Sequence, residues 1–97
     1  MSFSFHPEAE EELFAAIDFY EEREAGLGFD FSIEVFTAIN SVVAYPSAWP
    51  ILEESIRRCL VNRFPYAVLY SVESRGIFIL AVMHQRRKPG YWKERVG

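Results

Sequence analysis

The spacing of apolar side chains changes once along this chain, and that change restricts the possible folds more than any other feature. Up to Tyr45, apolar residues recur every three or four positions, as they do on one face of an α-helix. After Ser55 they alternate with polar residues or form short apolar runs, a pattern typical of β-strands. A chain of 97 residues is long enough for one domain. Helices followed by strands within one domain predict an α+β fold.

Two helices are predicted in the first half of the chain. The first spans residues 7–24, because Pro7 suits the first turn of a helix and glutamates follow it at the positive end of the helix dipole. A short turn with Gly26 and Gly28 leads into the second helix, residues 29–45, which Pro46 stops, so the pair forms an α-hairpin. The apolar face of the first helix contains Ala9, Leu13, Ala16, Ile17 and Tyr20. The expected face of the second contains Phe29, Ser32, Phe36, Ile39 and Val43, widened by Phe31, Val35 and Val42.

Strands are predicted over residues 2–5, 56–62, 66–73 and 77–84, and residues 47–54 are predicted to form a loop. The last three strands are joined by three or four residues, which allows only antiparallel neighbours. We therefore expect residues 1–97 to form a single domain in which a small antiparallel β-sheet packs on an N-terminal α-hairpin. The predicted order is β-α-α-β-β-β, followed by a basic C-terminal tail, Gln85–Gly97. Because two strands are apolar on both faces, the second face of the sheet has only the tail to cover it, or awaits a partner.

Charge is distributed unequally between the two halves. Residues 1–54 carry a net charge of −11 and residues 55–97 a net charge of +7, which together give the total of −4. The total excludes a uniformly basic nucleic-acid-binding protein. The segregation indicates either that a polyanion or acidic partner meets the second half, or that the two halves attract one another.

Cellular location is predicted from three further features of the sequence. The longest apolar run, Ile77–Met83, is far shorter than the roughly eighteen residues that a membrane span requires. Acidic residues begin at Glu8, before an apolar signal-peptide segment could form. Cys59 is the only cysteine, so no disulfide within the chain is expected. We therefore expect a cytoplasmic protein without a membrane partner.

Known catalytic and metal-binding motifs have little support in the sequence. The two histidines, His6 and His84, do not have the spacing of metal ligands, and no glycine-rich phosphate loop is present. We expect no metal and no cofactor. Cys59 and His84 could act as a nucleophile and its base, but the sequence offers no residue to orient them.

Two segments resemble the RelE/ParE toxins of bacterial type II toxin–antitoxin modules. They are residues 57–70, which include the Phe-Pro-Tyr turn at positions 64–66, and residues 79–92, which end in His-Gln-Arg-Arg-Lys-Pro-Gly-Tyr-Trp. The opening at residues 5–9 and the predicted order of elements are also similar to that fold. The resemblance extends over nearly the whole chain and implies one of two activities. ParE-type toxins poison DNA gyrase, whereas RelE-type toxins cut messenger RNA on the ribosome.

The resemblance implies a set of charged residues for the RNA-cutting branch, and this chain has only part of it. Matching positions hold Arg58, Arg86 and Tyr91, and His84 is a further candidate acid or base. Two other positions that require basic residues hold Leu60 and Ala67, which cannot stabilise a phosphate. The resemblance therefore favours a ParE-like toxin of a plasmid stabilisation module, which inhibits growth by poisoning DNA gyrase and is neutralised by a cognate antitoxin.

Alternatives remain open for the function and for individual residues. The chain could instead be an enzyme, a ribosome-dependent mRNA endonuclease, or an inactive relative that acts only as an interaction domain. The basic turn, residues 86–88, could be merely solvated. The tail aromatics could anchor the tail to the core, and Arg58 could pair with Glu53 or Glu54. Without antitoxin, a homodimer is also conceivable. The residues expected to bind the target or the antitoxin are Arg63, Arg86, Arg87, Lys88, Tyr91 and Trp92.

Overall fold

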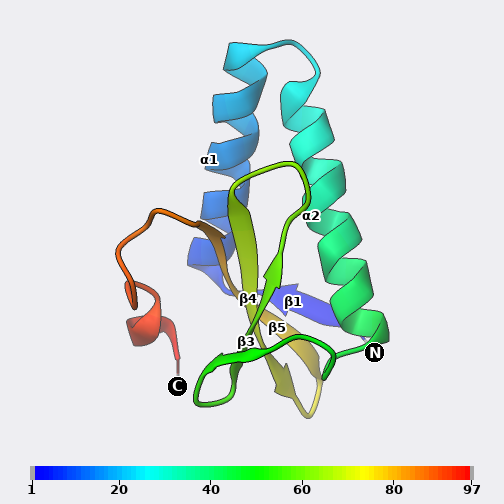
Figure 1. The fold of residues 1–97 in the computed structure, drawn as a ribbon, viewed down its shortest axis with the longest axis vertical. Helices are drawn as coiled ribbons and strands as arrows, with labels where there is room; N and C mark the ends of the chain where they lie inside the picture. Colours follow the sequence, from blue (N-terminus) through cyan, green and yellow to red (C-terminus); the bar gives the residue numbers. More distant parts are fainter. Residues whose placement is uncertain (1, 97) are drawn as a thin grey trace.

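A computed structural model describes residues 2–96, and its order of elements confirms the α+β fold (Figure 1). Met1 and Gly97, the two ends of the predicted 1–97 domain, lie outside the described residues. The helices are α1 (Pro7–Arg23) and α2 (Leu27–Ala44). The strands are β1 (Phe3–Phe5), β2 (Ile51–Glu53), β3 (Ile56–Leu60), β4 (Tyr66–Glu73) and β5 (Gly76–His84). A short 3-10 helix, η1 (Lys93–Arg95), lies in the tail.

The strands form one sheet in the order β1-β5-β4-β3-β2. The predicted antiparallel pairing of β3 with β4 and of β4 with β5 is confirmed. β1, however, runs parallel to β5, with Phe3 opposite Ile77, so the sheet is mixed. The rule that short connections give antiparallel neighbours does not apply to β1, because more than 70 residues separate it from its partner.

The prediction of a loop over residues 47–54 is wrong in part, because β2 lies within it. Ile51 pairs with Arg57 and Glu53 with Ile56, in an irregular register. All three residues of β2 are exposed. So short and exposed a strand has no alternation of apolar and polar residues for sequence reasoning to detect.

Helix α1 begins and packs as the sequence predicts. The His6 side chain caps it, since its Nδ1 accepts a hydrogen bond of 3.0 Å from the backbone N–H of Glu8, and Pro7 occupies the first helical position. Its buried residues, Ala9, Leu13 and Ala16, belong to the predicted apolar face.

Helix α2 packs through only part of the predicted face, since Ile39 and the widening residues Phe31, Val35 and Val42 are buried. Phe29 and Phe36, which were expected to be buried, are 66% and 37% exposed. A helix with apolar residues around most of its circumference has no single stripe that identifies its inner face, so the positions of α1 and the sheet decide the orientation. The side chains that α2 buries are Phe31, Val35, Ala38, Ile39 and Val42.

The start of α2 is held against α1 by the Glu21 carboxylate and by the close approach of Gly28 to the backbone of α1. The two Glu21 carboxylate oxygens accept hydrogen bonds from the backbone N–H groups of Gly26 (2.8 Å) and Gly28 (3.0 Å). They thereby satisfy N–H groups at the helix start that have no partner within the helix. A Cβ atom at Gly28 would lie 2.5 Å from the Ile17 carbonyl oxygen and 2.9 Å from Glu21 Cβ. The hairpin therefore requires glycine at this position.

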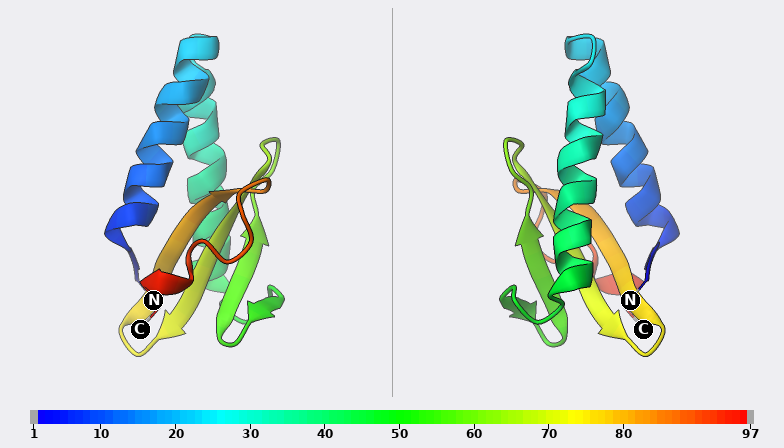
Figure 2. Two further views of the ribbon diagram at one scale, coloured as in Figure 1. Left: turned by 90° about the vertical axis from the view of Figure 1, so that its left-hand side faces the viewer. Right: turned by 90° about the vertical axis from the view of Figure 1, so that its right-hand side faces the viewer.

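Both faces of the sheet are covered, one by the hairpin and the other by the tail. In the right-hand view of Figure 2, α2 lies in front of the sheet and the tail behind it. The helix side holds the larger core cluster, with Val68, Tyr70 and Ile79 from the sheet. The tail side holds a smaller cluster in which Trp92 is only 4% exposed. Trp92 packs there with Ile56, Leu69, Leu80 and Ala81.

Within residues 2–96, α2 is the one helix that is long and apolar enough to cross a membrane by length and composition. It contributes buried side chains to the core between the hairpin and the sheet. A core helix of a folded domain passes the same test of composition.

Replacing Gly28 by Ala should destabilise the protein by about 1–3 kcal/mol, because the added methyl group forces the two helices apart. The midpoint of urea unfolding measures the effect. Asn40→Ala, at an exposed position of the same helix, is the control and should change the stability by less than about 0.5 kcal/mol. Equal midpoints for the two variants would contradict the close packing of the helices at Gly28.

Candidate functional site

The carboxylate of Glu12, on α1, connects the hairpin to the tail. One oxygen accepts hydrogen bonds from the Tyr91 hydroxyl (2.5 Å) and from Arg95 Nη2 (3.0 Å). The other accepts from Arg95 Nη1 (2.9 Å) and from the backbone N–H of Val82 on β5 (3.1 Å). Four hydrogen bonds therefore end on one carboxylate whose side chain is 16% exposed. We call this group of residues the tail network.

Arg95 and Tyr91 are each held by further contacts in the tail network. The Arg95 side chain is 8% exposed, donates to the Leu80 carbonyl (3.2 Å) and lies 3.3 Å from the Glu8 carboxylate. Its hydrogen bond to Glu12 raises the pKa of Arg95 above its ordinary value. Burial, followed by the hydrogen bond to Glu12, raises the pKa of the Tyr91 hydroxyl well above its ordinary value. The Tyr91 hydroxyl therefore remains protonated and hydrogen-bonded to Glu12.

The ion pairs of residues 2–96 all join the acidic half of the chain to the basic half. Besides the pairs of Arg95 with Glu12 and Glu8, Arg63 lies 3.8 Å from Asp30. Lys93 lies 3.1 Å from Glu53. The segregated charges thus attract one another within the fold, as one of the two interpretations of the sequence expected.

Five of the eight predicted site residues line two hollows, and Arg63, Arg86 and Lys88 line neither. The first, which we call the tail hollow, has a volume of about 300 Å³ and lies between β2, β3 and the tail, with Arg58, Arg87 and Lys93 in its lining. The second, also about 300 Å³, lies beside α1 and is lined by Tyr91, His84 and Arg87. Arg87 contributes to both, and Arg86 to neither.

The residues proposed for RNA cleavage are therefore not gathered at one point. Arg58 lies in the tail hollow, whereas His84 and Tyr91 line the other. His84 Nδ1 accepts a hydrogen bond of 3.0 Å from the backbone N–H of Arg86, and its ring packs on Tyr66. Leu60 and Ala67 face each other across β3 and β4, so this part of the sheet has no charge to offer a phosphate.

Cys59 and His84 do not form a catalytic pair. Strand β4 separates β3, which carries Cys59, from β5, which carries His84, and two strand spacings amount to about 10 Å. Burial raises the pKa of the Cys59 thiol to about 11, so the thiolate is rare near neutral pH. Within residues 2–96, no three His, Cys, Asp or Glu side chains are grouped so as to hold a metal ion.

The residues predicted to contact a target or antitoxin differ in their exposure. Arg86, Arg87 and Lys88 are exposed. Trp92 is buried against the sheet, and Tyr91 is half-buried. The guanidinium carbon of Arg87 lies 3.9 Å from the centre of the Tyr91 ring. Arg63 adopts a left-handed backbone conformation (φ 70°) in the turn before β4. The two remaining cations of the tail, Lys93 and Arg95, were not among the predicted site residues.

Glu12, whose carboxylate binds the tail, was the main residue of this region that sequence reasoning missed. It is one of several glutamates in the first half of α1, and neither its spacing nor its neighbours distinguish it from Glu11. Only the pairing of β1 with β5 and the path of the tail show that Glu12 faces Val82 and Arg95.

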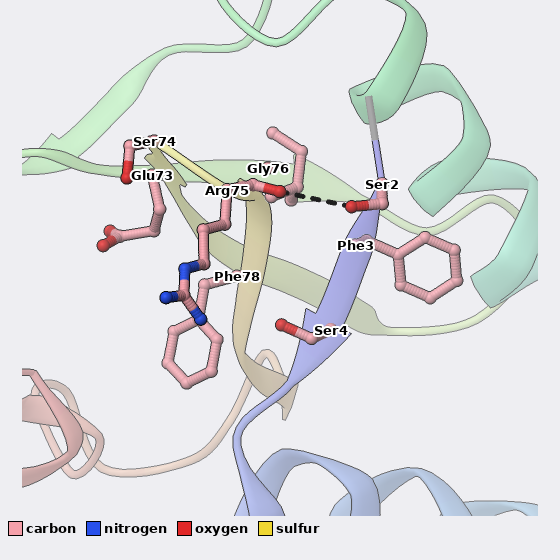
Figure 3. Close-up of a pocket in the computed structure, with 9 residues that line it drawn as sticks. Ser2, Phe3, Ser4, Glu73, Ser74, Arg75, Gly76 and Phe78 are labelled. Atoms are coloured by element: carbon pink, nitrogen blue, oxygen red, sulfur yellow. Dashed lines mark hydrogen bonds between the residues drawn. The ribbon is translucent and has the colours of Figure 1, made fainter.

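A third hollow, of about 540 Å³, lies at the far end of the sheet between β1 and the β4–β5 turn (Figure 3). The Ser2 hydroxyl donates a hydrogen bond to the Arg75 carbonyl there (3.2 Å), and Gly76 adopts a φ of 134° against the Ser2 backbone. None of the predicted site residues lines this hollow.

Replacing Glu12 by Gln should destabilise the protein by about 2 kcal/mol, because the buried Arg95 guanidinium loses the nearer and more buried of its two carboxylate partners and keeps only Glu8. Urea unfolding followed by tryptophan fluorescence measures the change. Glu11→Gln, one position earlier and exposed, is the control and should have almost no effect. If both variants unfold at the same urea concentration, the tail network does not stabilise the fold.

Tyr91 should make the stability fall at alkaline pH. Its raised pKa means that folding favours the protonated hydroxyl, so this stabilisation is complete below pH 10 and is lost as the pH rises further. Relative to Tyr91→Phe, the unmodified protein should lose up to about 1.4 kcal/mol of stability per pH unit above pH 10. Urea unfolding at a series of pH values measures the two slopes, and parallel slopes would contradict the assignment.

Comparison with known proteins identifies the family. Residues 3–89 match the family of the ParE toxin of the type II toxin–antitoxin system, parDE. A solved structure described as the chromosomal ParDE TA system from P. aeruginosa contains a chain with the same fold, at a TM-score of 0.72 and 21% identity. The likeness covers 87% of this chain and 95% of that one. No curated protein sequence matches. The family match spans most of the chain, which therefore belongs to the ParE toxin family of type II toxin–antitoxin systems.

Proposed function

We propose that this chain inhibits bacterial growth by binding and poisoning DNA gyrase, and that a cognate antitoxin neutralises it. It would act in the cytoplasm, as the toxin of a plasmid stabilisation module. The observation that carries the choice of target is the failure of the RNA-cutting residues to meet. Arg58 and the His84–Tyr91 pair line different hollows, and Leu60 and Ala67 occupy positions that the chemistry requires to be basic.

The state of Tyr91 also favours action by binding over RNA cleavage. Its hydroxyl donates to Glu12, and its raised pKa disfavours the transfer of its proton. The tail network thus uses the tail's titratable aromatic residue to hold the tail in place. We therefore assign Tyr91 and Trp92 a supporting role, in which they position the adjacent basic turn.

The basic turn is the surface that we propose for contact with the target. Arg86, Arg87 and Lys88 are exposed next to each other between β5 and the anchored part of the tail. Within residues 2–96, none of the three forms an ion pair with a carboxylate. Arg63, in the turn before β4, provides a further exposed cation.

The outer surface of the hairpin is the place that we propose for antitoxin binding. Large apolar side chains lie exposed on both helices, among them Phe14 and Phe19 on α1 and Phe29 and Ile33 on α2. Phe29 is 66% exposed and Phe14 56%. Large apolar side chains that a fold leaves exposed to water are typical of protein interaction sites. In the absence of antitoxin, the same surface would support a homodimer.

Inducing the isolated chain in bacteria should stop growth and alter DNA supercoiling while messenger RNA remains intact. Co-expression with the neighbouring small reading frame should restore growth. Arg86→Ala/Arg87→Ala should reduce the inhibition at least about tenfold in the inducer concentration required. Arg75→Ala, an exposed arginine in the third hollow, is the control.

Two outcomes would contradict this proposal. Message cleavage at codon positions with normal supercoiling would favour the RelE-like endonuclease. Unimpaired growth, together with a stable complex with the neighbouring gene product, would indicate an inactive relative that acts only as an interaction domain, and unimpaired growth without a complex would contradict the toxin proposal altogether.

A further inference from the structure

The C-terminal tail is attached to the rest of the fold by its side chains and not by its backbone. Within residues 2–96, the backbone hydrogen bonds of residues 86–96 remain inside the tail or reach only His84, the last residue of β5. The preceding residue, Gln85, still donates from its backbone N–H to the Pro65 carbonyl (2.8 Å). Figure 2 shows the tail crossing one face of the sheet without pairing with a strand. Residues 86–96 could therefore leave this face without breaking the backbone pairing of the sheet.

The strongest of the side-chain attachments lie at an edge of β5 that no strand covers. β1 pairs with β5 only as far as Ile79. Beyond it, the Leu80 carbonyl accepts a hydrogen bond from Arg95 (3.2 Å), and the Val82 N–H donates to Glu12 (3.1 Å). The pair of Glu12 with Arg95 thus takes the place of a neighbouring strand, because it satisfies backbone groups that an edge strand leaves unpaired.

These attachments depend on one another. If Tyr91 and Arg95 move away, the Glu12 carboxylate loses three of its four hydrogen bonds and becomes open to water. Its remaining bond, to Val82, then competes with solvent. Contacts that share one carboxylate in this way are made and lost together.

The rest of the fold has a core of its own. The larger core cluster, between the hairpin and the sheet, has no member from the tail among the described residues. Only the smaller cluster includes tail residues, namely Trp92 and, at its margin, Tyr91. The pair of Lys93 with Glu53 is about half exposed on both sides and contributes little. Loss of the tail contacts therefore leaves most of the buried apolar surface in place.

We propose that residues 86–96 open and close over the sheet as one cooperative unit while the hairpin and the strands remain folded. In the closed state, Trp92 covers Leu69 and Leu80, and the Tyr91 ring supports Arg87. In the open state the second face of the sheet is uncovered and the basic turn is no longer held. A ligand that binds only one of the two states shifts the population toward it. The inference is independent of the identity of the target and of the antitoxin.

Hydrogen exchange of the full chain, followed by NMR at a series of low urea concentrations, tests this inference. The amide of Val82 reports on the bond to Glu12, that of Arg95 on the tail, and that of Ala81 on the pairing of β5 with Leu69. Val82 and Arg95 should exchange with the same opening constant, almost independently of urea, because tail opening exposes little surface. Ala81 should be protected at least about tenfold more strongly, and its exchange should rise steeply with urea.

Tyr91→Phe tests whether the unit is cooperative. The change removes one hydrogen bond to Glu12 and should speed the exchange of both Arg95 and Val82 about tenfold, although the Tyr91 hydroxyl bonds to neither residue. Tyr45→Phe, the same change at a tyrosine that is 69% exposed, is the control and should alter neither rate more than about twofold. Circular dichroism verifies that both variants are folded.

Three results would overturn the inference. Equal protection of the three amides, with the same dependence on urea, would mean that the tail opens only when the whole chain unfolds. Faster exchange of Arg95 alone in Tyr91→Phe would mean that the tail frays without releasing the edge of β5. Faster exchange of Val82 alone would mean that Glu12 moves independently of the tail.

Discussion

The Glu12 carboxylate is the contact on which the arrangement of the tail depends. This carboxylate lies on α1 and accepts four hydrogen bonds. Three of them come from Tyr91 and Arg95 in the tail, and the fourth comes from Val82 on β5. With these residues bound, Trp92 covers Leu69 and Leu80 on the second face of the sheet. The Glu12 side chain thus holds the tail over the second face of the sheet, whose apolar residues would otherwise be exposed to water.

Charge segregation serves both the fold and the surface. Within residues 2–96, four ion pairs join the acidic half of the chain to the basic half, and Arg95 takes part in two of them. The pair of Glu12 with Arg95 is largely withdrawn from solvent, whereas Asp30 and Arg63 are about half exposed and contribute little. In the same described part of the chain, Arg86, Arg87 and Lys88 of the basic turn form no ion pair, and these are the cations that we assign to the target.

Local patterns were enough to predict the elements, but not how they meet. Pro7, Gly26 and Pro46 delimit the helices because their effects act on the adjacent backbone, and β4 has the predicted bounds. The parallel pairing of β1, the inner face of α2 and the choice of Glu12 depend on residues distant in sequence. For the site, the sequence predicted a basic turn after the last strand, but it could not show that Arg58 lies apart from His84 and Tyr91. That separation depends on the order of β3, β4 and β5 in the sheet and on the path of the tail.

The parallel pairing of β1 with β5 has a consequence for synthesis of the chain. Phe3 can pair with Ile77 only after another 74 residues have been added to the chain. At a translation rate of roughly 5–20 residues per second, the first strand remains without its neighbour for about 4–15 s. The Glu12 carboxylate remains without Arg95 for longer still, because 83 positions separate the two residues in the sequence. The sheet and the tail that covers it are therefore completed only as the last tenth of the described chain is made, long after both helices have been synthesised.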